Sequence, residues 1–203
     1  MDRYLMSQYN PLTVGNSWEY LNNGKSTISH KVVEEVSLNG IAMEKVISSD
    51  GSVVLLKNRD GLDTYEIKKK VGKLSYSPPI SLSPEIVKPG VAHAYVSKVT
   101  FSLFGINFNF GNISGSTVLT GVEDVTVPAG HFPDCLKFES YAYQRKPLKA
   151  TSKLIIWFAR NVGEVKCEFE TSVAGFKTTQ RKELLHATIG KRHFPEVLAE
   201  SRY

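Results

Sequence analysis

Hydrophobic and charged positions alternate strictly in the segment that begins at Glu164. Val165, Cys167 and Phe169 occupy the hydrophobic positions, and charged side chains, Glu164 first, occupy the others. Successive side chains of a β-strand point to opposite faces, so this pattern predicts a strand with one buried face and one face in water. Residues 154–159, LIIWFA, show no alternation, which predicts a central strand covered on both faces.

Turn signals divide the first seventy residues into similar short runs. The strongest is Asn39-Gly40, a pair that favours the two-residue turn of a β-hairpin, and it separates runs at 26–38 and 41–47. Further runs at 53–57 and 62–69 each follow an Asp-Gly pair. This part of the chain is therefore predicted to be an up-and-down meander.

Prolines interrupt the pattern between residues 77 and 90. The segment holds four of them, and proline cannot donate a hydrogen bond to a sheet, so we predict a connector between two halves of the sheet. Strands are predicted to resume after it. The later runs lie at 95–103, 106–110, 118–127, within 127–170, and at 172–189.

These runs together predict an all-β protein with little helix. We expect a single, strongly curved antiparallel sheet of about ten strands that forms an open or nearly closed barrel. The chain of 203 residues is long enough for one such domain. We expect residues 1–10 to form an N-terminal extension, 11–190 the β domain, and 191–203 a tail that frays, apart from one helical turn beginning at Pro195.

The charge of the chain is mildly positive. There are 25 lysines and arginines against 20 aspartates and glutamates, a net charge of +5. The basic residues stand in separate short runs, so we interpret them as a solvated surface and predict no nucleic-acid partner. A patch that binds nucleic acid or an anionic membrane is the less favoured alternative. The first nine residues lack the apolar stretch of a signal peptide, and no run approaches the ~18 apolar residues of a membrane span, so no transmembrane segment is predicted.

The two cysteines, Cys135 and Cys167, are predicted to be free. In a sequential meander the strand at 154–159 lies between the strands that carry them. Two strand spacings of ~4.8 Å exceed the ~7 Å limit between the Cα atoms of a disulfide. Both are expected to be small buried hydrophobic residues, with a reactive thiol as the less favoured alternative.

No motif for catalysis, metal binding or cofactor binding is present in the sequence. The five histidines show neither H-x-x-x-H nor H-E-x-x-H spacing, and the cysteines do not stand at the spacing of zinc ligands. There is no G-x-S-x-G elbow, phosphate-binding loop or dinucleotide fingerprint. We therefore predict no catalytic residues, no metal site and no cofactor.

Aromatic residues supply the candidate binding surface. Phe101, Phe104, Phe108, Phe110 and Trp157 are expected to line the concave face of the curved sheet. Two alternatives stay open. The rings could simply fill the core, or they could stack on nucleic-acid bases, which is less favoured without a concentrated basic stripe beside them.

Three motifs resemble those of a family of uncharacterised bacterial exported or lipoprotein-type domains. They are PLTVGNSWEY at 11–20, VPAGHFPDCLK at 127–137 and WFARNVGEVK at 157–166, and the similarity extends over residues 10–189. More loosely, such domains are similar to the half-barrels of the LolA and LolB lipoprotein carriers, whose concave face holds acyl chains. The resemblance implies a half-barrel fold, an apolar ligand and a periplasmic or exported location.

The function predicted from the sequence is that of a non-catalytic binding domain for a lipid or other apolar ligand in the bacterial cell envelope. One alternative is a structural domain with a filled core that works through contacts with an envelope protein. An enzyme of unknown reaction is the least favoured, because it would need several carboxylates or histidines converging in one cleft.

Overall fold

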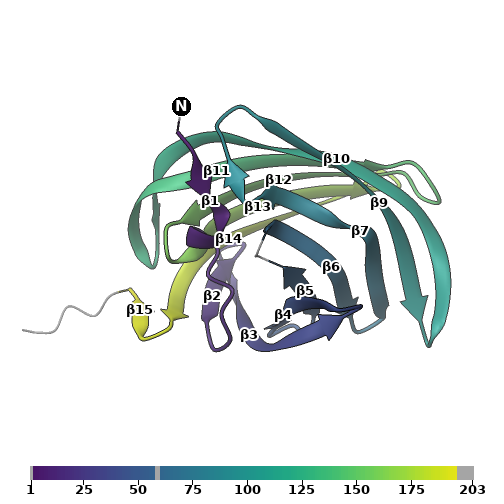
Figure 1. Cartoon of the computed structure of the whole chain (residues 1–203), viewed down its shortest axis with the longest axis horizontal. Helices are drawn as coiled ribbons and strands as arrows, with labels where there is room; N and C mark the ends of the chain where they lie inside the picture. The colour runs from purple at the N-terminus through teal and green to yellow at the C-terminus, as the bar shows by residue number, and fades with distance from the viewer. Residues whose placement is uncertain (1, 58–59, 196–203) are drawn as a thin grey trace, which may run out of the picture.

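Almost all of the regular structure in the computed structural model is β-strand, over the residues that it describes, 2–57 and 60–195 (Figure 1). The helical element of this part of the chain is one 3-10 turn, η1 (Met6–Gln8). The strands are β1 (Tyr4–Leu5), β2 (Ser17–Asn22), β3 (Ser26–Leu38), β4 (Ile41–Ser48), β5 (Val53–Lys57), β6 (Gly61–Lys69), β7 (Gly72–Pro84), β8 (Ile86–Val87), β9 (Ala92–Leu103), β10 (Ile106–Val127), β11 (Gly130–Gln144), β12 (Ala150–Ala159), β13 (Gly163–Val173), β14 (Phe176–Ile189) and β15 (Arg192–Phe194).

The sheet closes on itself. Apart from β8, the strands from β2 to β14 pair antiparallel with their neighbours in the chain, and β14 pairs with β13 on one side and with β2 on the other. In the described part of the chain the result is a barrel of twelve strands, in which the long strands β9 to β14 arch over β2 to β7 (Figure 1). The all-β prediction is confirmed, and the barrel is closed rather than open.

Local turn chemistry sets the meander from β2 to β6. Asn39 and Gly40 have φ angles of 53° and 79°, the left-handed backbone that a tight hairpin turn requires. Strands β3 and β5 have the bounds that the turn signals predict. In this half of the barrel, the turn residues in the sequence therefore predict where the strands begin and end.

The predicted connector at residues 77–90 is wrong in its first half, because β7 continues to Pro84. β7 pairs with β9 over Lys73–Ser77, and with β6 in two stretches, Gly72–Ser75 and Ile80–Pro84. Pro78 and Pro79 fall between these two paired stretches, where the register of β6 and β7 shifts. Prolines are tolerated at such a shift because no ladder hydrogen bond is required there.

The first ten residues, predicted as an extension, pack against one end of the barrel. β1 pairs with β8, and Gln8 accepts a backbone hydrogen bond of 2.7 Å from Asn161 in the β12–β13 turn. Met6 is fully buried and Tyr9 nearly so. This N-terminal segment therefore covers the end of the barrel where β12 turns into β13.

The chain also forms a strand just after residue 190, β15. β15 pairs with β14, and the ring of Phe194 is buried against Phe132 with 6.1 Å between ring centres. The expectation that residues 192–194 fray is wrong for this reason. The predicted helical turn beginning at Pro195 falls mostly outside the described residues.

The two cysteines lie on strands separated by a third, as predicted. The sheet order places β12 between β11, which carries Cys135, and β13, which carries Cys167, and both thiols are free and buried. Cys135 belongs to a core cluster that includes Trp18. Cys167 belongs to a second cluster with Met6 and Phe158, so the N-terminal segment shares a core with the barrel.

Candidate ligand-binding lumen

The barrel encloses a cavity of about 430 Å³. Side chains from every barrel strand except β14 line it, and most of them are apolar, such as Leu56, Ile67, Ile80, Leu154 and Phe169. Pockets for small molecules typically measure about 300–1,000 Å³ and are lined in this way. The size and the lining of the cavity suit an apolar ligand.

A second cavity of about 290 Å³ adjoins the first. The two share Tyr76, Ile113, Ala142, Ser152 and Phe169 in their walls. We treat them together as one lumen, because the same side chains face both. A lumen of this extent suits an elongated molecule better than a compact one.

Strand β12 shows how the sequence builds the lumen wall. Leu154, Ile156 and Phe158 face the lumen, whereas Trp157 between them faces outward and is also buried. The absence of alternation in LIIWFA thus reflects two apolar faces, as the sequence predicts.

Four polar side chains gather at one side of the barrel, Tyr20, His30, Glu164 and Lys182, and we call them the polar group. The first three line the lumen, and Lys182 of β14 lies behind them, in contact with Glu164. Nζ of Lys182 lies 2.7 Å from Oε1 of Glu164 and 4.9 Å from the centre of the Tyr20 ring, and the His30 ring lies 5.3 Å from the same ring. The side chains of Lys182 and Glu164 are only 12% and 18% exposed. The ion pair is therefore largely shielded from water.

Oε1 of Glu164 is a buried acceptor, and its partner is the Lys182 ammonium 2.7 Å away. Buried polar atoms in proteins nearly always have such a partner. Glu164 also lines the lumen, so one wall of an otherwise apolar cavity is polar at this point.

The surroundings of these groups fix their protonation states. Burial, with the Lys182 ammonium adding to it, lowers the pKa of His30 from 6.5 to about 4, and burial raises the pKa of Cys167 to about 12. Burial also raises the pKa of Tyr20 well above its usual value. Burial acts to lower the pKa of Lys182, but Glu164 and Cys167 act the other way, and the pKa is raised. At pH 7 the imidazole is neutral, and the thiol, phenol and ammonium keep their protons.

We expect His30 to make the protein less stable as the pH falls from 6.5 to 4. The unfolded chain protonates this imidazole below pH 6.5, whereas the native state keeps it neutral down to about pH 4. The unfolded state then binds more protons, so the free energy of unfolding falls with pH, by up to about 3 kcal/mol over this window. In chemical denaturation at pH 7 and pH 4, His30→Gln should lose less stability than the wild type.

The matched control is His193→Gln, because His193 is exposed on β15. This variant should lose stability in parallel with the wild type. A parallel loss in His30→Gln as well would contradict the neutral, buried imidazole.

The structure separates the five aromatic residues that the sequence assigned to a concave wall. Phe110 lines the second cavity, and its ring packs 6.0 Å from Phe101, which in turn lies 6.5 Å from Phe108. Phe104 stands in the β9–β10 turn, 96% exposed. The β9–β10 hairpin extends past the end of β11, which pairs with β10 only as far as Ile113. Of these four rings only Phe110 lines the lumen.

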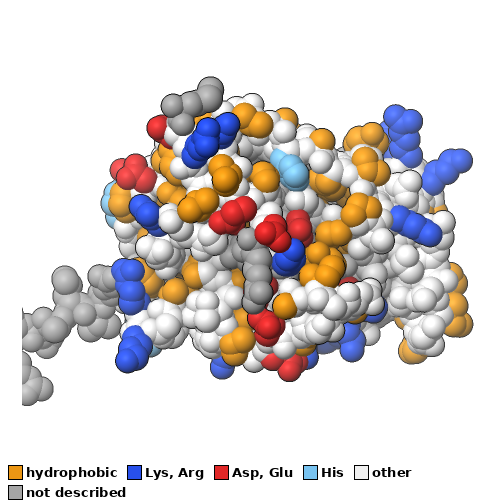
Figure 2. Space-filling view, viewed as in Figure 1, with side chains coloured by type: hydrophobic (Ala, Val, Ile, Leu, Met, Phe, Trp, Pro, Cys, Tyr) orange, Lys and Arg blue, Asp and Glu red, His pale blue; other side chains and the backbone are white. Residues whose placement is uncertain are grey.

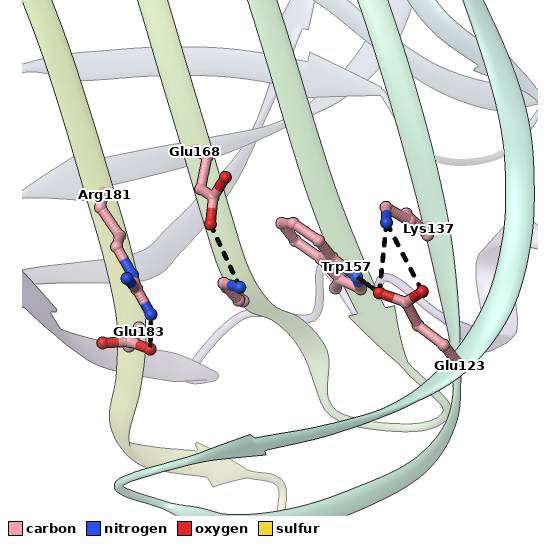
Figure 3. Close-up of polar contacts among 7 residues, drawn as sticks. Glu123, Lys137, Trp157, Glu168, Arg181 and Glu183 are labelled. Carbon is pink, nitrogen blue, oxygen red and sulfur yellow. Dashed lines mark hydrogen bonds and ion pairs between the residues drawn. The ribbon is translucent and has the colours of Figure 1, made fainter.

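Trp157 lies on the outer face of the barrel. Lys137 and Lys166, from the flanking strands, lie 5.3 Å and 4.4 Å from the centre of its ring, and its Nε1 donates a 2.7 Å hydrogen bond to Glu123 (Figure 3). The row of charged residues on this face continues to Glu168 and Arg181–Glu183 (Figure 3). In a strand that is apolar on both faces, the sequence pattern does not show which side faces the lumen.

Sequence reasoning missed the polar group. Glu164 was predicted to face water because it alternates with Val165 and Cys167. The register of β12 and β13 shifts between Trp157 and Phe158, and this irregularity turns Glu164 toward the lumen. No sequence signal marks the shift.

Residues 2–57 and 60–195 contain no group of three or more histidine, cysteine, aspartate or glutamate side chains arranged to hold a metal ion. No helix within those ranges has the length and hydropathy needed to cross a bilayer.

Comparison with known proteins gives similarity to solved structures only. No protein-family model matches the sequence, and no curated protein matches it significantly. The chain is similar to a "putative lipoprotein" from Parabacteroides distasonis, with 15% identity, a TM-score of 0.45, and coverage of 93% of this chain and 100% of that one. It is also similar to a "putative exported protein with YmcC-like fold" from Bacteroides fragilis, with 15% identity, a TM-score of 0.47, and coverage of 89% and 98%.

Proposed function

We propose that the protein is a non-catalytic carrier or binding domain for a lipid or other largely apolar molecule, held in the barrel lumen. The observation that carries the proposal is the 430 Å³ cavity with its apolar wall. A barrel that served only as a scaffold would be expected to fill its interior with side chains, since protein cores are close-packed. The cavity therefore favours a ligand over the alternative of a filled core.

The polar group refines the chemistry of this ligand. Glu164 and His30 line an otherwise apolar lumen, and the charge of Glu164 is already balanced by Lys182 behind it. A neutral group that both donates and accepts hydrogen bonds, such as an alcohol or a glycerol headgroup, can pair with these side chains without adding a charge. We propose a single-chain lipid with a hydroxyl-bearing end.

The protonation states in the lumen support binding rather than catalysis. A nucleophilic thiol or amine must lose its proton, but the pKa of Cys167 is about 12 and that of Lys182 is raised. A general acid or base works best with a pKa near the ambient pH, and His30 titrates at about 4. Three members of the polar group line one cavity, as residues of an active site would, yet His30, Tyr20 and the neighbouring Lys182 are held in unreactive forms.

The proposed location is the bacterial cell envelope. This part of the proposal is supported by the three sequence motifs that resemble exported and lipoprotein-type domains. Fractionation of the native host would test it, with the protein expected in the envelope fractions and a cytoplasmic location contradicting it.

Displacement of a lumen-bound fluorescent dye tests the proposed function. Oleic acid, monooleoylglycerol and a lysophospholipid should each displace the dye saturably, and monooleoylglycerol should bind most tightly. Ala142→Trp places a large side chain in the lumen, because Ala142 lines both cavities, and should weaken binding at least about tenfold.

The matched control is Tyr141→Trp, at the neighbouring position on the same strand, where the side chain is half exposed. Its affinity should equal that of the wild type. Absence of saturable displacement in the wild type, or equal affinities in the two tryptophan variants, would contradict a ligand in the lumen.

A further inference from the structure

Four hairpin turns, far apart in the sequence, lie at the same end of the barrel. They are the turns β6–β7, β9–β10, β11–β12 and β13–β14, and they lie toward the right of Figure 1. Alternate turns of an antiparallel meander share an end, so the topology directs these four turns, together with β2–β3 and β4–β5, to the same end of the barrel. The N-terminal segment covers the opposite end, through Gln8 and the β12–β13 turn. We call the four turns the hairpin end.

The hairpin end exposes large apolar side chains. Phe104 is 96% exposed, Phe176 80%, Val71 73% and Ile106 61%. Phe104 has a φ of 49°, a left-handed backbone conformation that bulky residues rarely adopt. Single exposed apolar residues are common on protein surfaces, but a group of them at one end, with one in a strained backbone, indicates an interaction surface.

Three of the four turns, all but β9–β10, carry positive charge. Residues 68–73, 144–150 and 172–178 hold eight lysines and arginines, of which Lys73 pairs with Glu66 and Lys177 with Glu170, each at 2.8 Å. The other six, at 68–70, 145, 146 and 149, have exposed side chains. Figure 2 shows blue side chains and orange side chains along the right-hand end of the molecule. The basic residues that stand apart in the sequence are therefore gathered by the fold rather than scattered.

The lumen approaches this end of the barrel. The second cavity is lined by Phe110, Gln144 and Ala150, which stand beside the β9–β10 and β11–β12 turns. A molecule that left the lumen at this end would meet the exposed side chains of the hairpin turns first.

We propose that the hairpin end docks on the surface of an anionic lipid bilayer. Exposed phenylalanine and aliphatic side chains insert at the boundary between headgroups and acyl chains, and the surrounding lysines and arginines contact anionic headgroups. The combination favours a membrane over a protein partner, because a protein groove that took the apolar tips would also need acidic residues opposite three separate turns. The inference goes beyond the proposed ligand and does not depend on it.

Vesicle co-sedimentation tests the proposal. The protein should bind vesicles of phosphatidylcholine and phosphatidylglycerol in a ratio of about 7:3, and should bind vesicles of phosphatidylcholine alone at least about tenfold more weakly. Binding to the anionic vesicles should weaken as salt is raised, because exposed charges are screened. Failure to bind the anionic vesicles at low salt would overturn the proposal.

Two pairs of variants locate the docking surface. Phe104→Ser with Phe176→Ser, and separately Lys69→Glu with Lys146→Glu, should each lower binding to the anionic vesicles at least about tenfold. The controls lie away from the hairpin turns, Val14→Ser with Val91→Ser for the apolar pair and Lys191→Glu for the charges; all three residues are exposed. Equal losses in test and control variants would overturn the assignment of the surface.

The same variants keep this proposal separate from the ligand in the lumen. Phe104 and Phe176 do not line either cavity, so their double variant should displace the fluorescent dye as the wild type does. Loss of vesicle binding with unchanged displacement supports docking as an independent property. Loss of both together would indicate misfolding or a shared site, and would contradict the division made here between lumen and hairpin end.

Discussion

Replacing Lys182 by methionine is expected to lower the free energy of unfolding by about 3–5 kcal/mol. The change removes the ammonium that lies 2.7 Å from Glu164 and leaves a carboxylate in the lumen without its counter-charge. The side chain of Glu164 is only 18% exposed, so water compensates little for the loss. Denaturation with urea at pH 7, followed by tryptophan fluorescence, measures the change.

Two controls separate burial of charge from loss of an ordinary ion pair. Lys182→Met with Glu164→Leu removes both charges and should recover most of the lost stability, since a buried pair can be replaced by apolar residues at little cost. Lys177→Met breaks a pair of similar length, 2.8 Å to Glu170, whose side chains are both about half exposed, and should cost less than about 1 kcal/mol. A Lys182→Met variant that is no less stable than Lys177→Met would contradict the shielded ion pair.

Replacing Met6 by alanine is expected to lower the free energy of unfolding by about 2–5 kcal/mol. Met6 is fully buried and shares a core cluster with Leu136 and Phe158 of the barrel. Truncation leaves a cavity between the N-terminal segment and the barrel wall, and the surrounding strands are too rigid to collapse into it. Urea denaturation again gives the value.

The neighbouring residue supplies the control. Leu5→Ala removes a side chain of similar size that is 41% exposed, and should cost less than half as much. Equal costs at the two positions would mean that the N-terminal segment does not pack as the structure shows.

The sequence predicts this fold well wherever two signals agree. At Asn39-Gly40 a turn signal separates two strand-like runs, and after Glu164 apolar residues alternate with charged ones. The strands at both places lie where expected. The prediction fails where a residue that usually ends a strand lies inside one. The prolines at 78 and 79 suggested a break, although a strand tolerates them at a shift in register.

The short elements β1, η1 and β15 could not be predicted from the sequence, for a different reason. A strand of two residues, β1, and one turn, η1, are too short to show any period, so nothing in residues 4–9 indicates that Met6 completes a core. The same holds for β15, which is three residues long. Their positions depend on tertiary contacts with β8 and β14 that no local pattern encodes.

The sequence predicted what kind of site the protein has, an apolar interior, but not which residues form it. An apolar interior follows from the curved sheet, but which side chains face it depends on register. One shift at Trp157–Phe158 turns Glu164 inward, and β14 brings Lys182 beside it from eighteen residues away along the chain. Likewise, the hairpin end gathers charges from segments that are far apart in the sequence, which only the topology reveals.

The most direct test of the lumen as a ligand site is a crystal structure of the protein with a bromine-labelled single-chain lipid. The anomalous signal of the bromine should lie inside the barrel, near Tyr76 and Phe169, which line both cavities. The hydroxyl end of the lipid should lie within hydrogen-bond distance of Glu164 or His30, which line the lumen. A bromine signal confined to the outer surface, with an empty lumen, would contradict the account.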